Sequence, residues 1–275
     1  MRVAVVIPAR YASTRLPAKP LLQETGKYLI QHVYERAVEA RHAGEVLVAT
    51  DDERIFDAVS GFGGRVVMTR RDHQSGTDRI AEVAAHLSAE VIVNLQGDEP
   101  EIDPAAIDLL VELMADANPD MATLAAPIGN IETYLSPNVV KVVCDDRGRA
   151  LYFSRSPIPM VRDGDFDFSA RPSPYLQHLG IYAYRREFLL RIAATPPHPL
   201  ERLEKLEQLR VLGTVPRSGS ASWQAPIAGS ILLTITRSSS KNIAVSWPDE
   251  LHDGSRKNSP LREDGRNGSV RYSGK

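Results

Sequence analysis

Residues 3–20, VAVVIPARYASTRLPAKP, contain a short apolar run followed by a basic loop. The run at 3–7 is aliphatic, mostly β-branched and without polar alternation, which is typical of a strand buried on both faces of a parallel sheet. Pro8 has no backbone N–H to donate, so we expect the hydrogen-bonded ladder to end there. These residues predict a buried strand of an α/β sheet.

The loop after this strand carries three cations, Arg10, Arg15 and Lys19. Ligands of α/β sheets bind at the carboxyl ends of the strands. Guanidinium groups hold phosphate oxygens in pairs and a lysine adds a mobile point charge, so the loop suits a polyphosphate. Its composition also fits an ordinary solvated basic loop. The glycine patterns of P-loops and Rossmann sites do not occur in it.

The bulk properties of the 275-residue chain argue against several classes of protein. With 43% hydrophobic residues it can bury a substantial core, and a net charge of −2 argues against nucleic acid as the main partner. No apolar run approaches the ~20 residues that span a bilayer, and a strand stands where a signal peptide would begin, so we expect no membrane association. The single cysteine, Cys144, fits a packing role in a reducing cytoplasm.

Strand and helix patterns alternate through the first part of the chain. The predicted strands are 3–7, 45–50, 65–68 and 90–95, and the predicted helices are 28–41, 53–62, 78–87 and 104–117. The crossovers are long enough for parallel pairing. The alternation therefore predicts a doubly wound, mostly parallel α/β sandwich.

From residue 121 onward the alternation stops. The sequence DDRG at 145–148 is a turn signal between two apolar runs, so we expect a β-hairpin insertion. The other elements predicted here are strands at 139–143, 151–153 and 178–184, a polar loop at 163–174 and a helix at 200–212. Residues 213–275 are rich in serine, glycine and proline, and such a segment cannot bury enough apolar surface to offset its ordering entropy. We expect it to be a disordered tail.

The sequence QGDEP at 96–100 directly follows the fourth predicted strand. Asp98 should face the same sheet edge as the basic loop. Mg²⁺ prefers carboxylate oxygens together with substrate phosphates, so Asp98 is the candidate metal ligand, and Gly97 would let a nucleotide approach the backbone. Asp98 and Glu99 also fit an ordinary N-terminal cap of the next helix, but their position opposite a phosphate loop favours the metal.

The sequence HQSGTDR at 73–79 lies between the third strand and its helix. Ser75 and Thr77 are residue types that cap helices, and the helix N-terminus offers free amides. The segment is therefore either a well-capped helix start or the floor of a base or ribose site. Arg79 would reach the nucleotide in the second case and lie on the surface in the first.

Separated segments, in order along the chain, resemble the 3-deoxy-manno-octulosonate cytidylyltransferase family, the CMP-Kdo synthetases of lipopolysaccharide assembly. The segments are IPARYASTRLPAKPL at 7–21, HQSGTDR at 73–79, QGDEP at 96–100, YFSR at 152–155, HLGIY at 178–182 and LEQL at 206–209. The resemblance spans residues 2–212 almost without gaps. It implies a nucleotidyltransferase domain over 1–212 with the fold of nucleotide-diphospho-sugar transferases.

The resemblance implies a Mg²⁺-dependent reaction in which the anomeric hydroxyl of Kdo attacks the α-phosphorus of CTP and releases pyrophosphate. It makes Arg10, Lys19 and Asp98 the catalytic residues, with Asp98 as the metal ligand. The implied nucleotide-binding residues are Ala9, Arg10, Arg15, Lys19, Gln74, Ser75, Gly76, Arg79, Gln96 and Gly97, and the implied sugar-acid-binding residues are Arg155, His178, Tyr182, Glu207 and Gln208. A homodimer with the hairpin region at its contact is also implied.

The chain departs from the family after residue 212. The family ends with a Gly-Val-Asp-Thr-Pro motif whose aspartate supplies a second metal ligand, and the printed sequence lacks it there. Three hypotheses remain: an active CMP-Kdo synthetase, the same scaffold acting on another sugar acid such as sialic acid, or an inactive nucleotide-binding remnant. The HQSGTDR and HLGIY segments favour Kdo over sialic acid.

We predict that residues 213–275 are a frameshifted tail. In a shifted reading frame, the last two bases of each new codon are the first two bases of the codon for the next printed residue. Those two bases are nearly fixed by the identity of that residue, so only a few amino acids fit each position. Reading residues 228–236 in this way permits Gly-Val-Asp-Thr-Pro-Asp-Asp-Tyr, and residues 214–223 permit an alternating apolar strand. Resequencing the gene checks this: if the nucleotides do not encode Val-Asp-Thr-Pro in the alternative frame, the prediction fails.

Overall fold

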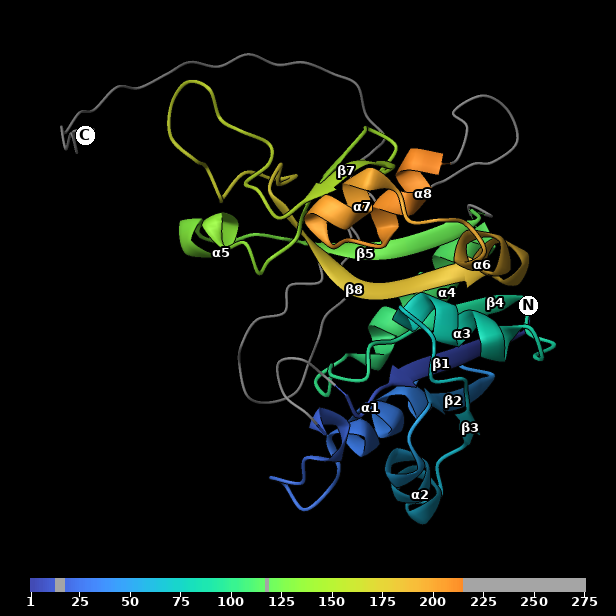
Figure 1. Ribbon diagram of the computed structural model, residues 1–275. Helices are drawn as coiled ribbons and strands as arrows, with labels where there is room; N and C mark the ends of the chain where they lie inside the picture. Colours follow the sequence, from blue (N-terminus) through green and yellow to red (C-terminus); the bar gives the residue numbers. More distant parts are fainter. Residues whose placement is uncertain (13–17, 117–118, 215–275) are drawn as a thin grey trace. The chain divides into compact units, whose positions relative to one another are not determined.

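The computed structural model in Figure 1 describes residues 1–12, 18–116 and 119–214. The strands are β1 Val3–Ala9, β2 Glu45–Thr50, β3 Val66–Met68, β4 Val91–Asn94, β5 Met121–Pro127, β6 Lys141–Cys144, β7 Ala150–Ser154 and β8 Leu176–Arg185. The helices are α1 Leu29–Val38, α2 Glu53–Gly61, α3 Gly76–Ala84, α4 Pro104–Asp116, α5 Ile131–Leu135, α6 Arg186–Ala193, α7 Pro199–Glu204 and α8 Gln208–Thr214, with a 3₁₀ turn η1 at Lys19–Leu21. The strand–helix alternation predicted before residue 117 is confirmed.

In the described part of the chain the strands form one sheet in the order β3-β2-β1-β4-β8-β6-β7, with β5 paired to β8. Strands β3, β2, β1 and β4 run parallel. Strand β8 joins antiparallel to β4, β5 and β6, and the hairpin β6–β7 forms the far edge. The predicted doubly wound α/β fold with a hairpin insertion is therefore confirmed, and its sheet is mixed.

Strand β1 is buried on both faces, as its unbroken apolar run predicts. Val5 and Ile7 belong to a core that also contains side chains of α1, α2 and α4. Ala4 and Val6 belong to the opposite core, which contains side chains of α3 and α6. Helices therefore cover both faces of the sheet around β1, and its end is held from two sides.

The ladder of β1 extends beyond the predicted end at Pro8. Pairing with β2 continues through Pro8 and Ala9, whereas pairing with β4 ends at Val6. Proline removes one donor, but its fixed φ is compatible with an extended strand, so β1 lasts two residues longer than predicted. Ala9, one of the predicted nucleotide-binding residues, is consequently buried inside the strand.

The single helix predicted at 200–212 is wrong. Two helices, α7 and α8, are separated by a turn, because Lys205 adopts a left-handed backbone conformation with a φ of 55°. The ion pair between Arg210 and Glu201, 2.6 Å long and buried, ties the two helices together. Glu207 consequently projects from the turn instead of lying within a helix.

The predicted hairpin is present as β6 and β7. Its turn is closed by Asp145, whose carboxylate accepts hydrogen bonds from the backbone N–H groups of Arg147 and Arg149. Cys144 lies half-buried in β6, and burial together with the neighbouring Asp145 raises the pKa of its thiol to about 12. The thiol stays protonated at neutral pH, which agrees with the predicted packing role.

Two sequence-based predictions lie outside the described residues. One is the role of Arg15 and the other is the disorder of the tail. Gly213 and Thr214, which composition assigned to the tail, belong to the end of α8. Among the helices that the structure describes, none is long and apolar enough to cross a membrane.

A buried carboxylate attaches α4 to the segment that follows α1. Asp108 is 4% exposed, and it accepts hydrogen bonds from the backbone N–H of His42 at 2.8 Å and from Nε of Arg41 at 3.0 Å. Burial raises the pKa of this carboxyl, but the bonds from His42 and Arg41 outweigh that effect and hold the pKa below its ordinary value. Asp108 is therefore ionised and stabilises the fold at neutral pH.

We expect Asp108→Ala to lower the free energy of unfolding by about 2 kcal/mol, because it removes two hydrogen bonds to a charged group. Urea unfolding followed by circular dichroism measures this, with Asp57→Ala on the exposed face of α2 as a control that changes stability by less than about 0.5 kcal/mol. The folded pKa of Asp108 lies below its unfolded value of about 4, so its contribution is present above that pH and is lost as the pH falls through the folded pKa. Equal losses in the two variants would contradict this role.

Candidate functional site

The basic loop and the QGDEP segment meet at one edge of the sheet. Strands β1 and β4 pair in parallel, so the segments that follow them leave the sheet on the same side. Lys19, in η1, places its Nζ 2.7 Å from Oδ2 of Asp98. The two side chains are 37% and 51% exposed, so a phosphate or a cation from solvent can reach both groups.

Two glycines allow neighbouring segments to pack against Pro8 at the end of β1. A Cβ on Gly97 would lie 2.9 Å from the carbonyl oxygen of Pro8, which is closer than Cβ atoms approach backbone oxygens. A Cβ on Gly76 would lie 3.6 Å from Cγ of Pro8, an ordinary contact. Gly97 was predicted to admit a nucleotide. The structure gives it a further role, because only glycine lets the QGDEP segment pack directly on β1.

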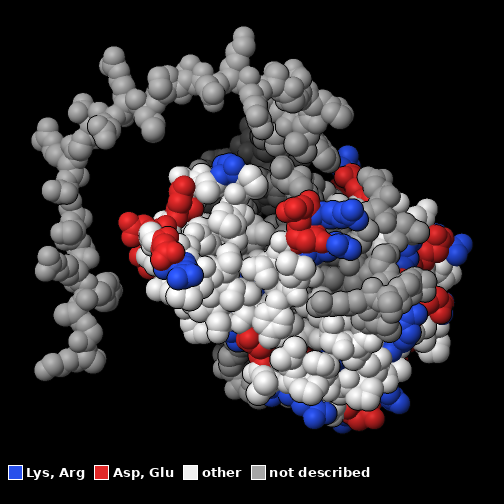
Figure 2. All heavy atoms as spheres, turned by 90° about the horizontal axis from the view of Figure 1, so that it is seen from above, with Lys and Arg blue, Asp and Glu red and all other residues white. Residues whose placement is uncertain are grey.

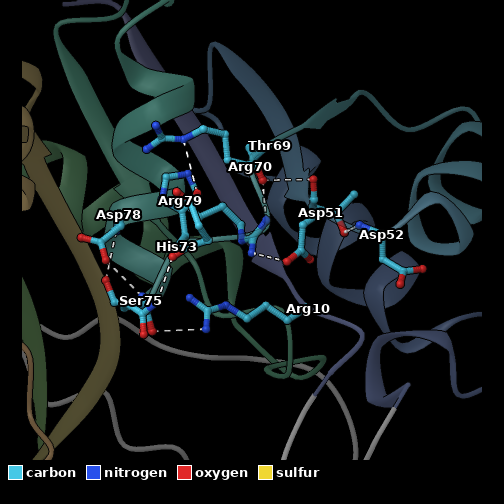
Figure 3. A network of polar contacts seen from close by, with 12 residues as sticks. Arg10, Asp51, Asp52, Thr69, Arg70, His73, Ser75, Asp78 and Arg79 are labelled. Carbon is cyan, nitrogen blue, oxygen red and sulfur yellow. Dashed lines mark hydrogen bonds and ion pairs between the residues drawn. The ribbon is translucent and has the colours of Figure 1, made fainter.

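Arg10 joins the end of β1 to the segment before α3. Its Nη1 donates to the carbonyl oxygen of Gln74 at 3.3 Å, and Figure 3 shows the side chain extended toward the Ser75 end of that helix. Its Nη2 is buried and has no hydrogen-bond partner in the described part of the chain. A guanidinium with an unused donor beside a helix N-terminus suits an anionic ligand.

The N-terminus of α3 is capped by Ser75, as predicted. The Ser75 hydroxyl accepts from the backbone of Asp78 at 3.1 Å, and the Asp78 carboxylate accepts from the backbone of Ser75 at 3.1 Å, which is a capping box. Gln74 is exposed and donates through Nε2 to the carbonyl oxygen of Asp72. Thr77, the other predicted cap, lies inside the helix. The first turn keeps backbone N–H groups that can face a phosphate or a base.

Arg79 points into the protein. Its side chain is fully buried, Nη2 forms an ion pair with Asp51 at 2.8 Å, and Nη1 donates to the hydroxyl of Thr69 (Figure 3). The surface position considered from sequence is therefore wrong. Asp51 follows β2 and Thr69 follows β3, so this buried cation links α3 to the carboxyl ends of two strands. Its contact with a nucleotide stays a prediction.

Three predicted sugar-acid residues form one contact group on β8 and α8. The ring of His178 packs against Tyr182, with 5.2 Å between the ring centroids, and against Phe153 at 5.1 Å. The phenol of Tyr182 donates to Oε1 of Gln208 at 3.2 Å. Gln208 is 4% exposed, and its Nε2 has no partner among the residues that the structure describes. A buried amide donor beside two aromatic rings suits a polar group of a sugar.

Arg155 lies just after β7 and is held by backbone oxygens. Its Nε donates to the carbonyl of Glu204 at 2.8 Å and its Nη1 to the carbonyl of Pro137 at 3.1 Å. The Glu204 carboxylate accepts from the backbone of Arg155 and from the hydroxyl of Ser154. Within the described ranges no carboxylate forms an ion pair with this guanidinium, which leaves its charge for a ligand carboxylate.

A buried lysine secures the backbone around Arg155. Lys141 is fully buried, and its Nζ donates to the carbonyl oxygens of Ser136 at 2.8 Å, Val139 at 2.7 Å and Arg155 at 2.6 Å. Burial and the charge of Arg155 lower the pKa of Lys141, and Glu204 acts in the opposite direction. Three acceptors match the three protons of an ammonium group, so Lys141 stays charged. Sequence reasoning missed this residue because lysines are mostly solvated.

The segments predicted to bind the nucleotide and those predicted to bind the sugar acid touch at two places. The hydroxyl of Thr77 donates to Oε2 of Glu207 at 2.5 Å, although 130 positions separate the two residues. Gln96 follows β4 and donates through Nε2 to Asn94, and a Cβ on Gly180 would touch Cγ of Gln96 at 3.7 Å. Residues that the sequence placed in separate groups therefore lie next to one another across α3, β4, β8 and the turn before α8.

Charges of both signs lie next to one another on the face in Figure 2, around broad uncharged areas. Exposed ion pairs recur among the described residues, for example Lys27 with Glu35 at 2.7 Å and Arg36 with Glu39 at 2.6 Å. Such pairs contribute little stability. Attraction of an anion is therefore local, at the sheet edge that carries Lys19, and does not come from a uniformly basic surface.

Comparisons with known proteins show the family to which the chain belongs. Residues 4–215 match a family model described as Cytidylyltransferase. The chain is 55% identical to a 3-deoxy-manno-octulosonate cytidylyltransferase of Geobacter metallireducens, over 77% of this chain and 86% of that protein. A relative of the same name from Pelobacter propionicus is 48% identical over 91% of this chain and 95% of its own length.

A solved structure titled CMP:2-keto-3-deoxy-manno-octonic acid synthetase complexed with CTP has a TM-score of 0.72. It is 48% identical and covers 78% of this chain and 86% of that chain. The chain belongs to the 3-deoxy-manno-octulosonate cytidylyltransferase family. The resemblance drawn from the separated sequence segments is thereby confirmed.

Asp98, the metal ligand predicted for this family member, lies at the sheet edge beside Lys19. Mg²⁺ needs only one or two protein carboxylates when substrate phosphates supply further oxygens. No group of three or more His, Cys, Asp or Glu that could hold a metal occurs in the described ranges. Burial and the neighbouring Asp98 raise the pKa of Glu99. The residues therefore fit a metal shared with a nucleotide better than a closed protein site.

His178 in this cytidylyltransferase is a neutral imidazole. The residue as a whole is partly exposed, but its ring packs against Phe153 and Tyr182, and burial of the ring lowers its pKa to about 3. The Thr123 hydroxyl donates its proton to the carbonyl of Ile181 at 2.7 Å, so its oxygen accepts from Nε2 of His178 at 2.9 Å. The proton of the ring therefore sits on Nε2. The residue can orient a substrate but carries no charge at neutral pH.

We predict that His178 stays neutral between about pH 5 and pH 8, where an unperturbed histidine titrates. Long-range ¹H–¹⁵N correlation spectra should show the Nε2–H form across this range, whereas the unfolded chain titrates near pH 6.5. Because the folded pKa is lowered, the unfolded state takes up a proton first, so this residue lowers stability as the pH falls below about 6.5. A titrating ring in the folded protein would contradict the assignment.

Proposed function

We propose that the protein is a nucleotidyltransferase that forms CMP-Kdo and pyrophosphate from CTP and Kdo. The contact between Lys19 and Asp98 supports the proposal, because a cation suited to phosphate and a carboxylate suited to Mg²⁺ lie together at the carboxyl edge of the sheet. The printed names of the relatives support the same two substrates. The alternative is that the same scaffold acts on another sugar acid, such as sialic acid. An assay with each sugar acid distinguishes the two.

In this mechanism the anomeric hydroxyl oxygen of the sugar acid attacks the α-phosphorus of CTP. The bond from that phosphorus to the bridging oxygen breaks, pyrophosphate leaves, and the proton of the attacking hydroxyl passes to water. The chain acts by positioning and by neutralising charge, without a protein nucleophile. Arg10 and Lys19 face the phosphates, Arg155 pairs with the sugar carboxylate, and Glu207 and Gln208 bind sugar hydroxyls.

Asp98 would hold the Mg²⁺ ion. The ion supplies Lewis-acid stabilisation of charge on the phosphates when it is bound. Lys19, whose Nζ lies 2.7 Å from Asp98, would neutralise charge on the distal phosphates. Of the two carboxylates expected to bind the metal, Asp98 thus lies in the described part of the chain.

The second metal ligand and the closing strand would be restored by the alternative reading frame beyond residue 212. The family model match ends at residue 215, which supports a change of sequence near that point. The alignment with the Pelobacter propionicus relative runs further along the chain, at lower identity. If the printed tail is the real one, an inactive nucleotide-binding remnant is the second candidate function.

We infer a homodimer in the cytoplasm, with the hairpin region at the contact. Leu151 on the edge strand β7 is 54% exposed and Leu203 on α7 is 79% exposed. Exposed apolar side chains favour an interface when they form a patch. Sedimentation equilibrium tests the inference, and the mass of a single 30.3 kDa chain at micromolar concentration would contradict it.

We expect the full chain to release pyrophosphate from CTP and Kdo in the presence of Mg²⁺, and not from CTP and sialic acid. Asp98→Asn replaces a charged ligand by a neutral near-isostere, so turnover and Mn²⁺ binding with CTP should both fall by about 100-fold while the circular dichroism spectrum is unchanged. Asp57→Asn on α2 is the matched control.

Each outcome of this experiment distinguishes between hypotheses. Unchanged activity of Asp98→Asn across a Mg²⁺ titration excludes Asp98 as a ligand. Pyrophosphate with sialic acid alone assigns the other sugar acid. Binding of CTP by the wild-type chain without pyrophosphate from either acid identifies the remnant.

A further inference from the structure

Glu207 projects from the turn between α7 and α8, and its backbone is fixed on both sides. Its carbonyl accepts from the backbone N–H of Arg210 at 3.0 Å, and the preceding Leu206 is buried in the core beneath the hairpin. The residue as a whole is exposed, but its carboxylate is partly buried, and burial raises its pKa. Among the residues that the structure describes, Thr77 alone donates a hydrogen bond to this carboxylate, at Oε2.

Thr77 lies in the first turn of α3 and is 6% exposed. Its hydroxyl is not used by the helix, because Ser75 is the cap and Asp78 completes the capping box. Threonine is also a weaker helix former than alanine. Helix formation therefore does not explain a threonine here, whereas the bond to Glu207 does.

A second hydroxyl group lies beside Thr77 in the interior. The phenol of Tyr184 is buried and lies close to Thr77 and Asn94. A threonine hydroxyl has one proton, and Thr77 gives it to Glu207. Charge-assisted hydrogen bonds of this kind are stronger than neutral ones.

We propose that Thr77 is a positioning residue, which holds the Glu207 carboxylate between the nucleotide-binding start of α3 and the sugar-acid side chains of β8 and α8. Oε2 is tied to Thr77, and Oε1 has no protein donor in the described part of the chain and is directed to the sugar acid. The proposal rests on the proposed function, since it takes Glu207 as a ligand of a sugar hydroxyl. It adds to that function a residue that touches neither reacting group.

Thr77→Val keeps the shape of the side chain and removes the hydroxyl, and Thr77→Ser keeps the hydroxyl. We expect Thr77→Val to raise the KM for Kdo about tenfold, the equivalent of one hydrogen bond to a charged group, with the KM for CTP changed less than twofold. Thr77→Ser should restore the KM for Kdo to near the wild-type value. In a Glu207→Gln background, Thr77→Val should add little further loss, because the two residues act as a pair.

The opposite results overturn the proposal. An equal rise in both KM values, or a serine variant as impaired as the valine variant, indicates a structural role of Thr77. An unchanged KM for Kdo in Thr77→Val removes the positioning role while the proposed function stands.

A readout independent of catalysis separates failure of the inference from failure of the function. The hydrogen bond from Thr77 favours the ionised form of Glu207, so ¹³C titration of the Glu207 carboxyl in the full chain should show a higher pKa in Thr77→Val than in the wild type and in Thr77→Ser. An unchanged pKa overturns the inference even if the wild-type chain makes no CMP-Kdo. If the wild-type chain releases no pyrophosphate but the pKa of Glu207 changes as expected, the proposed function is overturned instead.

Discussion

Burial of β1 on both faces is the constraint on which the site depends. The strand packs against α1 and α4 on one side and against α3 and α6 on the other, so Pro8, one residue before its end, is a fixed point. Gly97 lets the QGDEP segment pack on that proline, and the Gly76 segment lies in ordinary contact with it. The QGDEP loop and the start of α3 are thereby aligned with Arg10, which continues the same strand. Core packing therefore fixes the relative positions of these three segments in the absence of a ligand.

Two cations serve this edge in different ways. Arg79 is spent inside the protein on Asp51 and Thr69 and keeps the ends of β2 and β3 attached to α3. Each of the two has one donor nitrogen without a partner in the described part of the chain, Nη2 of Arg10 and Nε of Arg79, but only Arg10 is partly exposed. Burial and partners therefore give Arg79 a structural role, and we expect Arg10 to face a ligand.

The sequence was sufficient for elements whose signal is local. The apolar run at 3–7 predicted a doubly buried strand, and DDRG at 145–148 predicted the hairpin turn. Strand β5 was not predicted, because its pairing with β8 is interrupted by an irregularity after Thr123 and depends on residues 49 to 63 positions away. The break at Lys205 was missed because lysine rarely adopts the left-handed conformation that usually marks glycine or asparagine.

The candidate site follows the same division. The capping role of Ser75 is local and was predicted, since a capping box spans only four residues. The burial of Arg79 and of Lys141 depends on acceptors that come from other elements of the fold. The sequence around each residue therefore does not predict its burial. Contacts such as Thr77 with Glu207 are visible only once α3 and α8 are packed on the same sheet.

The charges around the sugar-acid residues favour an anionic substrate. Lys141 and Arg155 are both cationic and bind backbone carbonyls, and Glu204 is the carboxylate that lies among them. Glu207 lies apart from these three residues, where Thr77 in the first turn of α3 donates to its carboxylate, and Arg210 is already paired with Glu201. Lys141, Arg155 and Glu204 together therefore leave one positive charge beside β7 in the described part of the site. Coulomb attraction in a partly desolvated site is stronger than in water, so we expect this excess to favour a sugar that carries a carboxylate over a neutral sugar of the same size.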